Sequence, residues 1–176
     1  YYYLGSFDDY RGRYINRRLE ALEDVTPEDL MALQWDSYSL KAEEALPVML
    51  GLLEGTTVAD ELQSGLELLQ QWDYRYTAEA KAPVLFNSWL DSLYRLTFDE
   101  VFSRDKEDYP ILYPETWRFI ELLDESPNDL VFDQQQTAAI ETAADLVRTS
   151  YEQAAAEVLP LLDEGTDWNA HRGTRI

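Results

Sequence analysis

The amino-acid sequence predicts an all-α protein with about six helices. Apolar residues recur at spacings of three and four along most of the 176 residues, which is the period of one helix face. No segment keeps the strict apolar–polar alternation that is typical of a half-buried β-strand. With 45% hydrophobic and 13% aromatic residues, the chain has the composition of a globular protein with a buried core. We therefore expect residues 1–176 to form a single helical unit.

The first helix is expected to begin at Asp8 or Asp9. Acidic side chains at the start of a helix interact favourably with the positive end of its dipole. The apolar residues that follow recur at spacings of three or four, at Tyr14, Ile15, Leu19 and Leu22. The aromatic residues before this helix, 1–7, are expected to be extended or irregular.

The second helix has a strong start signal. Thr26 can accept a hydrogen bond as the N-cap, Pro27 suits the first helical position, and acidic residues follow in the first turn. The helix is expected to run toward Glu44. Pro47 then kinks or ends it, because proline removes a backbone donor and clashes with the preceding turn. Gly55 is expected to close this region.

Two more helices are expected between residues 58 and 97. The third helix covers residues 58–72 and ends where residues 72–76 break the helical pattern. Thr77 is expected to cap the fourth helix. The apolar stripe of this helix is wide enough to predict burial on two sides; it consists of Leu85, Phe86, Trp89, Leu90, Leu93, Tyr94 and Leu96.

The last two helices are expected after a polar loop at residues 105–114. A short fifth helix covers residues 115–123. Asp133 and Gln136 resemble a capping box and are expected to open the sixth helix. Its apolar residues are Ile140, Ala143, Val147, Tyr151, Ala154 and Val158. Residues 168–176 have no helical period and are expected to extend toward a sheet outside this chain.

The charge and the cysteine count exclude several classes of function. The net charge is −21, from 35 acidic and 14 basic residues, and it argues against nucleic-acid and membrane partners, because phosphate surfaces repel such a chain. The absence of cysteine excludes disulfides and thiolate sites. No apolar run reaches the roughly 18 residues that span a bilayer. The aromatic start at Tyr1, without an initiator Met or signal peptide, suggests a segment of a longer polypeptide.

Few residues are candidates for chemistry on pattern alone. His171 is the single histidine and thus the only possible base of a Ser-His-Asp arrangement; its tail-like position favours a structural or surface role. No metal-binding motif is present, so no metal site is predicted in this chain. The basic residues near the start, Arg11, Arg13, Arg17 and Arg18, are expected to form a solvated helix face.

Three stretches, in a fixed order, carry a resemblance to a known family. The first is residues 3–15, YLGSFDDYRGRYI, and the second is residues 25–39, VTPEDLMALQWDSYS. The third is residues 68–73, LLQQWD, followed by an alanine-containing helix with Leu85, Phe86 and Trp89. Residues 168–173, WNAHRG, add a weaker match. In their order and spacing these stretches resemble the penicillin amidase (penicillin acylase) family of N-terminal-nucleophile hydrolases.

The resemblance implies an internal fragment of the large (β) chain, the helical portion of a larger αββα hydrolase. Members cleave the acyl amide of β-lactams, acyl-homoserine lactones or related amides. Their nucleophile is an N-terminal serine, freed by self-cleavage of a precursor, whose own α-amino group is the base. An asparagine and a backbone amide hold the oxyanion. The nucleophile and these groups would lie before Tyr1, in the remainder of the acylase polypeptide, which is the expected partner.

The resemblance also implies a location, a cofactor and two site residues. The parent enzyme is expected to be periplasmic or secreted, and calcium is possible there. Arg11 aligns with the arginine that orients the N-terminal serine and the oxyanion asparagine; alternatively, it only pairs with Asp8 or Asp9. Leu4 falls where the family places an apolar side chain of the acyl pocket. We expect the isolated segment to be inactive. The competing hypothesis is a stand-alone acidic helical interaction module with no catalysis.

Overall fold

The computed structural model describes residues 9–103 and 113–173 of the chain. These residues form nine α-helices, two short 3-10 turns and no β-strand, so the predicted all-α class is confirmed. Seven of the helices have eight residues or more, close to the six that were expected. The helices are α1 (Tyr10–Glu20), α2 (Pro27–Trp35), α3 (Leu40–Leu53), α4 (Gln63–Gln70), α5 (Ala82–Thr97), α6 (Asp99–Ser103), α7 (Thr116–Glu125), α8 (Ala143–Asp163) and α9 (Trp168–Arg172).

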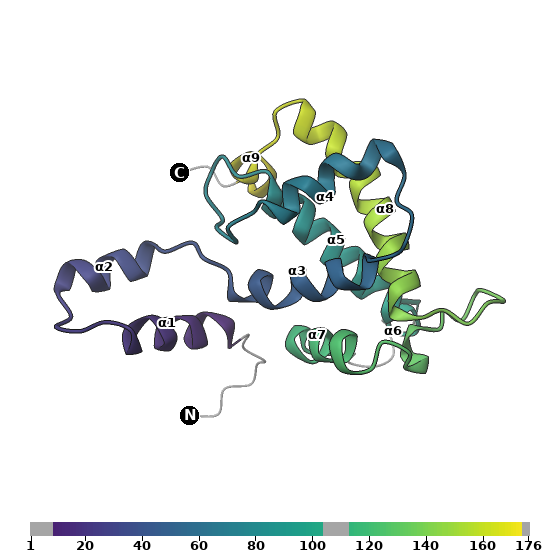
Figure 1. Ribbon diagram of the computed structural model, residues 1–176, viewed down its shortest axis with the longest axis horizontal. Helices are drawn as coiled ribbons and strands as arrows, with labels where there is room; N and C mark the ends of the chain where they lie inside the picture. The colour runs from purple at the N-terminus through teal and green to yellow at the C-terminus, as the bar shows by residue number, and fades with distance from the viewer. Residues whose placement is uncertain (1–8, 104–112, 174–176) are drawn as a thin grey trace.

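Helices α5 and α8 pack along each other and form the centre of the core (Figure 1). Trp89 of α5 and Tyr151 of α8 are fully buried with their ring centroids 5.0 Å apart. The Trp89 indole donates to the Val147 carbonyl and to Ser150 Oγ, both at 3.1 Å, so its only polar atom is satisfied inside the core. Helices α3, α4 and α7 pack around this pair. The predicted burial of α5 on two sides is confirmed.

Helices α1 and α2 project from this body as an antiparallel pair (Figure 1). We refer to residues 10–35 as the arm and to the other described residues as the body. The α2 start is as predicted: Thr26 and Asp29 form a reciprocal capping box, and Pro27 is the first helical residue. Leu33 is the only buried residue of α2, so this helix has little core of its own.

The expected single helix from Thr26 to Glu44 is wrong, because residues 36–39 separate α2 from α3. Asp36 Oδ1 accepts the Tyr38 amide at 3.1 Å, and Ser39 Oγ accepts the Ala42 amide at 3.2 Å. Such local side-chain bonds to the backbone compete with helix continuation. Pro47, which was expected to kink or end the helix, lies inside α3. The expected closing role of Gly55 is confirmed, since it has the positive φ of 80° that favours glycine.

Two predicted helix starts, those of α8 and α5, are wrong. Helix α8 begins after Thr142, whose capping box with Asp145 takes the place of the one predicted at Asp133. Ile140, expected on the buried face, lies before this cap and is 75% exposed. Helix α5 begins at Ala82 and not after Thr77. The carbonyls of Ala78 and Ala80 accept the amides of Asn169 and Trp168, respectively, so residues 78–80 pair with α9.

The expected extended tail is also wrong where the structure describes it. Residues 168–172 form α9, capped at its start by the Asp167 side chain, which accepts the Ala170 amide at 2.8 Å. Gly173 ends it in the left-handed conformation. The predicted loop at 105–114 lies mostly outside the described residues. The short fifth helix is confirmed as α7.

Candidate functional site

Arg11 lies in the first turn of α1 and reaches across the arm to the end of α2. Its Nη1 donates to the Asp36 carbonyl at 2.9 Å, and its Nη2 donates to the Leu33 carbonyl at 2.8 Å. A guanidinium is well placed there, because the last carbonyls of a helix lack partners and carry its negative dipole end. The α1 helix thus fixes the Arg11 backbone, while α2 fixes the guanidinium.

The other interpretation of Arg11, a pair with Asp9, is not what the structure has. The Asp9 carboxylate binds Arg13 Nε at 3.2 Å, one helical turn away. Asp8 lies outside the described residues. Leu4, the predicted acyl-pocket residue, also lies outside them.

The expected solvated face of basic residues is confirmed, because Arg11, Arg13, Arg17 and Arg18 are all exposed, but three of them also bind neighbouring segments. Besides Arg11, Arg13 binds both carboxylate oxygens of Glu44, at 2.6 and 3.0 Å. Arg17 binds Glu43 in the same two-pronged way, at 3.0 and 2.8 Å. The Arg17 hydrogen bond lowers the pKa of Glu43 from its ordinary value. Two paired guanidinium–carboxylate contacts therefore hold α1 against α3.

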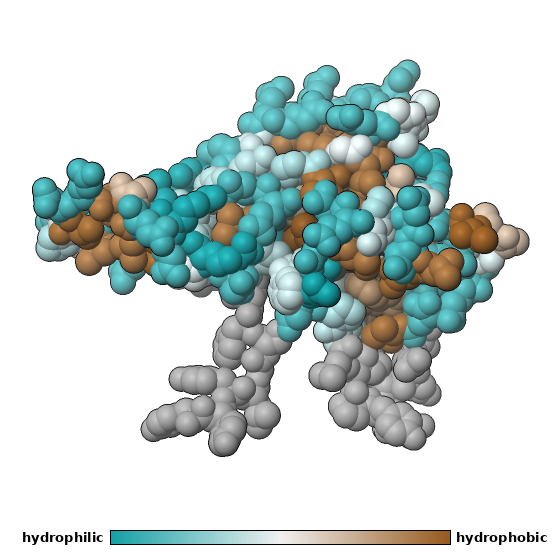
Figure 2. Space-filling view, turned by 60° about the horizontal axis from the view of Figure 1, so that its bottom comes forward, coloured by the Kyte–Doolittle hydropathy of each residue, from teal (hydrophilic) through white to brown (hydrophobic). Residues whose placement is uncertain are grey.

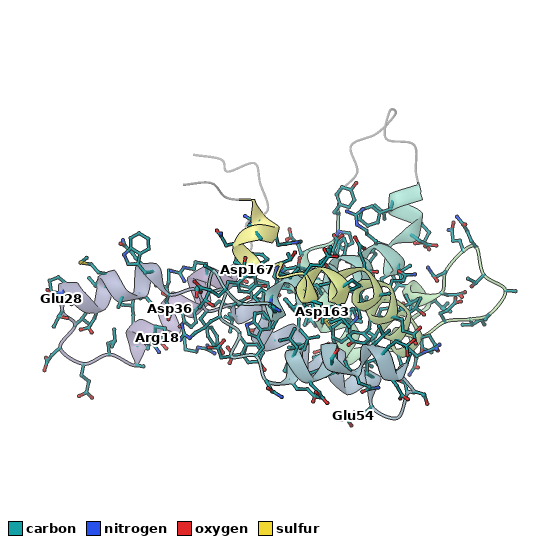
Figure 3. The ribbon with its side chains drawn as sticks, turned by 90° about the horizontal axis from the view of Figure 1, so that it is seen from above. Arg18, Glu28, Asp36, Glu54, Asp163 and Asp167 are labelled. Carbon is teal, nitrogen blue, oxygen red and sulfur yellow. The ribbon has the colours of Figure 1, made fainter. Side chains whose placement is uncertain are left out.

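Asp36 lies where the arm joins the body (Figure 3), and three hydrogen bonds to its carboxylate make it the centre of a polar cluster. Its Oδ1 accepts hydrogen bonds from the Tyr38 amide and the Arg75 guanidinium, and its Oδ2 accepts one from the Tyr14 hydroxyl. Its burial alone would raise the pKa of Asp36, but the hydrogen bonds from Tyr14, Tyr38 and Arg75 outweigh burial and lower that pKa. The carboxylate is therefore ionised at neutral pH.

The turn that supplies Arg75 is built by its own side chains. The Trp72 indole donates to the Arg75 carbonyl at 3.0 Å, and the Asp73 carboxylate accepts the Arg75 amide at 3.0 Å. Tyr74 has a left-handed φ of 62°, which lets the chain reverse within these few residues. The turn then pairs with the link between α2 and α3 through the isolated bridge of Tyr38 and Arg75.

A hollow of about 510 Å³ opens beside Arg11 and runs between the arm junction and α9. Among the described residues of its lining, Arg11, Lys41 and Arg172 contribute positive charge, and Asp36, already paired with Arg75, is the one acidic residue. The hollow is therefore positive in a chain whose net charge is −21. Such a local field attracts anionic and carbonyl-bearing groups. Asn87 of α5 and Trp168 of α9 also line it.

The remaining candidates are not brought to this hollow. His171 is exposed on α9 and stacks on Trp168 with ring centroids 5.8 Å apart; its structural or surface role stays a prediction. Within residues 9–103 and 113–173, no three metal-binding side chains gather in a way that could hold an ion. None of the helices in the described part of the chain is long and apolar enough to cross a membrane.

The described residues thus form an all-helical unit with Arg11 in the lining of a positively charged hollow. The sequence model of the penicillin amidase family matches residues 1–175. The chain therefore belongs to the penicillin amidase family. Membership indicates that it is part of an amidohydrolase.

Sequence reasoning singled out Arg11 but missed the residues that hold it. In the sequence Asp36 belonged to the second family-like stretch and was not singled out. The signal that could have indicated a helix end there is the pair of Asp36 and Ser39, because both side chains can bind nearby backbone groups. No sequence pattern indicated that Arg75 or Lys41 would lie near Arg11. Their positions depend on chain reversal at residues 72–76 and on the break before α3, which local periodicity does not specify.

Proposed function

We propose that this chain is the helical part of an amidohydrolase that cleaves acyl amides through an N-terminal serine outside the chain. The substrates are the acyl amides of β-lactams, acyl-homoserine lactones or related compounds. The observation that carries this proposal is Arg11: its guanidinium is held by α2 carbonyls at the rim of a positive hollow. A fixed cation there suits a residue that orients an N-terminal serine and an oxyanion amide, and its charge favours the neutral amine that serves as base.

The remainder of the acylase polypeptide is the proposed partner. Figure 2 shows apolar side chains gathered on the arm. Large apolar side chains there are 36–83% exposed, among them Leu19, Val25, Leu30, Met31 and Trp35. A soluble chain seldom leaves so many large apolar side chains together in water unless another surface covers them. This exposure favours a segment of an interlocked enzyme over a stand-alone module with a polar surface.

The location and the metal follow from the same proposal. A family enzyme made as a self-cleaving precursor is proposed to act in the periplasm or outside the cell. Calcium would be held by residues of the parent enzyme that do not belong to this chain. The resemblance of the three family-like stretches supports both statements.

The experiment compares the isolated chain with the whole polypeptide that contains it. Each is incubated with a chromogenic phenylacetyl or longer acyl amide, and release of the chromophore is followed. We expect turnover from the whole polypeptide only, with an acyl-enzyme adduct on its N-terminal serine by mass spectrometry. Turnover by the isolated chain above background would contradict the proposal, because no serine of this segment is assigned a catalytic role.

Arg11 is tested in the whole polypeptide by Arg11→Lys and Arg11→Ala. A lysine keeps the charge but cannot hold two carbonyls and an active-centre group in one plane. We expect kcat to fall by about tenfold or more in both variants with little change in KM, as for a group that acts only in the transition state. Unchanged kcat in Arg11→Ala would remove the proposed role.

A monomeric isolated chain with no apolar association would favour the interaction module.

A further inference from the structure

One residue, Asp36, holds Arg11 and the arm junction at the same time. Its main-chain carbonyl accepts Arg11 Nη1 at 2.9 Å. Its carboxylate accepts hydrogen bonds from Tyr14 of α1 and from Arg75 of the body. The side chain therefore ties α1 and the turn at residues 72–76 to the same point at which the backbone holds the guanidinium.

The Asp36 carboxylate is nearly enclosed, which makes its contacts costly to lose. Its side chain is 10% exposed, whereas the side chain of its partner Arg75 is 39% exposed. A largely buried carboxylate needs its hydrogen-bond donors, because unpaired charge in such a place is strongly unfavourable. Oδ1 has two donors and Oδ2 has one. The position of the Asp36 backbone is thus fixed by three contacts beyond its own helix.

The Arg11 contacts depend on this fixed backbone. Both acceptors with the shorter contacts, the carbonyls of Leu33 and Asp36, belong to the last turn of α2 and the residue after it. Within that turn Leu33 is buried, but Trp35 is 83% exposed and adds little packing. If the Asp36 carboxylate released Tyr14 and Arg75, the end of α2 would be free to move away from α1. The guanidinium would then lose both its partners and its direction.

We propose that Asp36 is a positioning residue for Arg11, acting through the end of α2 and not by contact with substrate. This inference rests on the proposed function, in which Arg11 supports the active centre. In this proposal the Asp36 carboxylate keeps the Arg11 guanidinium oriented at the hollow. Loss of the carboxylate is expected to affect Arg11 before it affects the fold of the body, whose core lies around α5 and α8.

The first test follows the Arg11 guanidinium itself by NMR in the chain, without reference to catalysis. Rotation of its Nη groups and exchange of its Nε proton with water are measured in Asp36→Asn. Asparagine keeps the size of the side chain but removes its charge, so Arg75 loses its ion pair. We expect both rates to rise by about five- to tenfold, the effect of losing a charge-assisted hydrogen bond. Unchanged rates would overturn the proposal.

The matched control is Asp29→Asn, at the other end of the same helix. Asp29 also binds the backbone and a side-chain hydroxyl, both of Thr26, and the Thr26 hydrogen bonds lower its pKa. It has no contact with Arg11, so Arg11 dynamics should not change in this variant. Equal effects in Asp29→Asn and Asp36→Asn would mean that Arg11 only reports on the general stability of α2, which also overturns the proposal.

A milder variant covers the case in which Asp36→Asn fails to fold. Tyr14→Phe removes one donor to Asp36 and keeps the ring that stacks on Tyr38 at a centroid distance of 5.0 Å. We expect Arg11 rotation to rise by about two- to threefold, in line with the loss of a single hydrogen bond. No change in Tyr14→Phe, with the arm still folded, would count against the proposal.

The second test is a double-mutant cycle on kcat in the whole polypeptide. We expect Asp36→Asn to lower kcat by about tenfold with KM little changed, and to add almost nothing in an Arg11→Ala background. A full Asp36→Asn effect without Arg11 would overturn the positioning role. If no variant or parent has amidase activity, the proposed function fails, whereas the NMR result on Arg11 still decides the positioning role.

Discussion

The body and the arm are both helical, but different forces hold them. In the body, α5 and α8 bury Phe86, Trp89 and Leu93 completely, and burial of large apolar side chains contributes most of the stability of a domain. In the arm, α2 buries only Leu33. The neighbouring helix α1 buries Tyr10 and Tyr14 and is also held by paired contacts from Arg13 and Arg17 to carboxylates of α3. Periodicity alone does not distinguish these two situations, because both produce helices.

The two regions also differ in where their side chains find partners. The body satisfies its polar atoms inside its own core, as the Trp89 indole does with Val147 and Ser150. The arm buries Tyr10, Tyr14 and Leu33, but its other large apolar side chains include five that are 36–83% exposed. In the proposed enzyme, the arm therefore carries Arg11 toward the active centre while the body anchors it. Substitutions in the two regions should therefore change stability by different amounts, and those in the arm should matter more in the whole polypeptide than in the isolated chain.

The largest effect is expected from Trp89→Ala in the body. The variant removes a fully buried ring that contacts Tyr151 at 5.0 Å and leaves a cavity between α5 and α8. We expect the free energy of unfolding to fall by about 3–5 kcal/mol. Urea unfolding followed by circular dichroism measures it. A loss below about 1 kcal/mol would show that α5 and α8 are not the main source of stability.

A smaller effect is expected where α4 approaches α8. A Cβ at Gly65 would lie 2.5 Å from the Tyr151 hydroxyl and 3.0 Å from a Leu85 methyl. The hydroxyl cannot easily move, because it donates to the Leu62 carbonyl at 2.7 Å. We expect Gly65→Ala to lower the free energy of unfolding by about 1–3 kcal/mol despite the better helix propensity of alanine.

Gly51→Ala is the control for Gly65→Ala in the same thermal or urea experiment. Gly51 also lies inside a helix, α3, but an added Cβ there meets no atom within 4 Å. Alanine should therefore raise stability by about 0.5–1 kcal/mol, because it restricts the unfolded chain and favours the helix. Equal signs for the two glycines would contradict the close approach of α4 to α8.

Acidification should affect the arm junction. Hydrogen bonds lower the pKa of Asp36 against its burial, and the Arg17 hydrogen bond lowers that of Glu43. A lowered folded-state pKa gives stability that is present above the unfolded value, 3.8 for Asp36 and 4.5 for Glu43, and is lost as the pH falls further. We expect the arm to lose about 1–2 kcal/mol of local stability below about pH 4.

Hydrogen-exchange protection factors at a series of pH values locate this loss. Protection should fall in α1 and α2 while α5 stays protected. Asp36→Asn serves as the control, because it has no carboxyl to titrate at that position and should flatten part of the pH response. Equal loss of protection in α5 and α1 would mean that the junction and the core unfold as one unit.

Much of the body could be predicted from sequence, because its helices have apolar stripes that pack inward. The α5 stripe through Leu85, Trp89 and Leu93 is buried as expected. Helix starts were harder to predict. Thr142 with Asp145 and Asp133 with Gln136 have the same capping pattern, and only the first caps a helix. The rule describes a local contact that both sites could make, whereas packing of α8 selects one of them.

The junction could be predicted only in part. Arg11 stood out in the first family-like stretch, but its partners are backbone carbonyls of Leu33 and Asp36, which any residue could supply. Asp36 ends α2 by accepting the Tyr38 amide, and the spacing of apolar residues does not reveal such a contact. The family-like stretch 25–39 meets the turn that follows the stretch 68–73, since Ser39 donates its amide to the Tyr74 carbonyl at 2.9 Å. Their proximity results from tertiary packing, which the local sequence does not specify.

The smallest effect in the isolated chain is expected from Trp35→Ala in the arm, although it removes the same side chain as Trp89→Ala. Trp35 is 83% exposed, so truncation removes little packing, and the free energy of unfolding should change by no more than about 0.5 kcal/mol. In the whole polypeptide the same substitution should cost about 2 kcal/mol, because a covered tryptophan is a typical anchor of an interface. Gln34→Ala, an exposed neighbour in the same helix, should be near neutral in both settings. Equal, small effects of Trp35→Ala in the chain and in the whole polypeptide would show that nothing covers the arm, and the contrast between arm and body would then be one of stability alone.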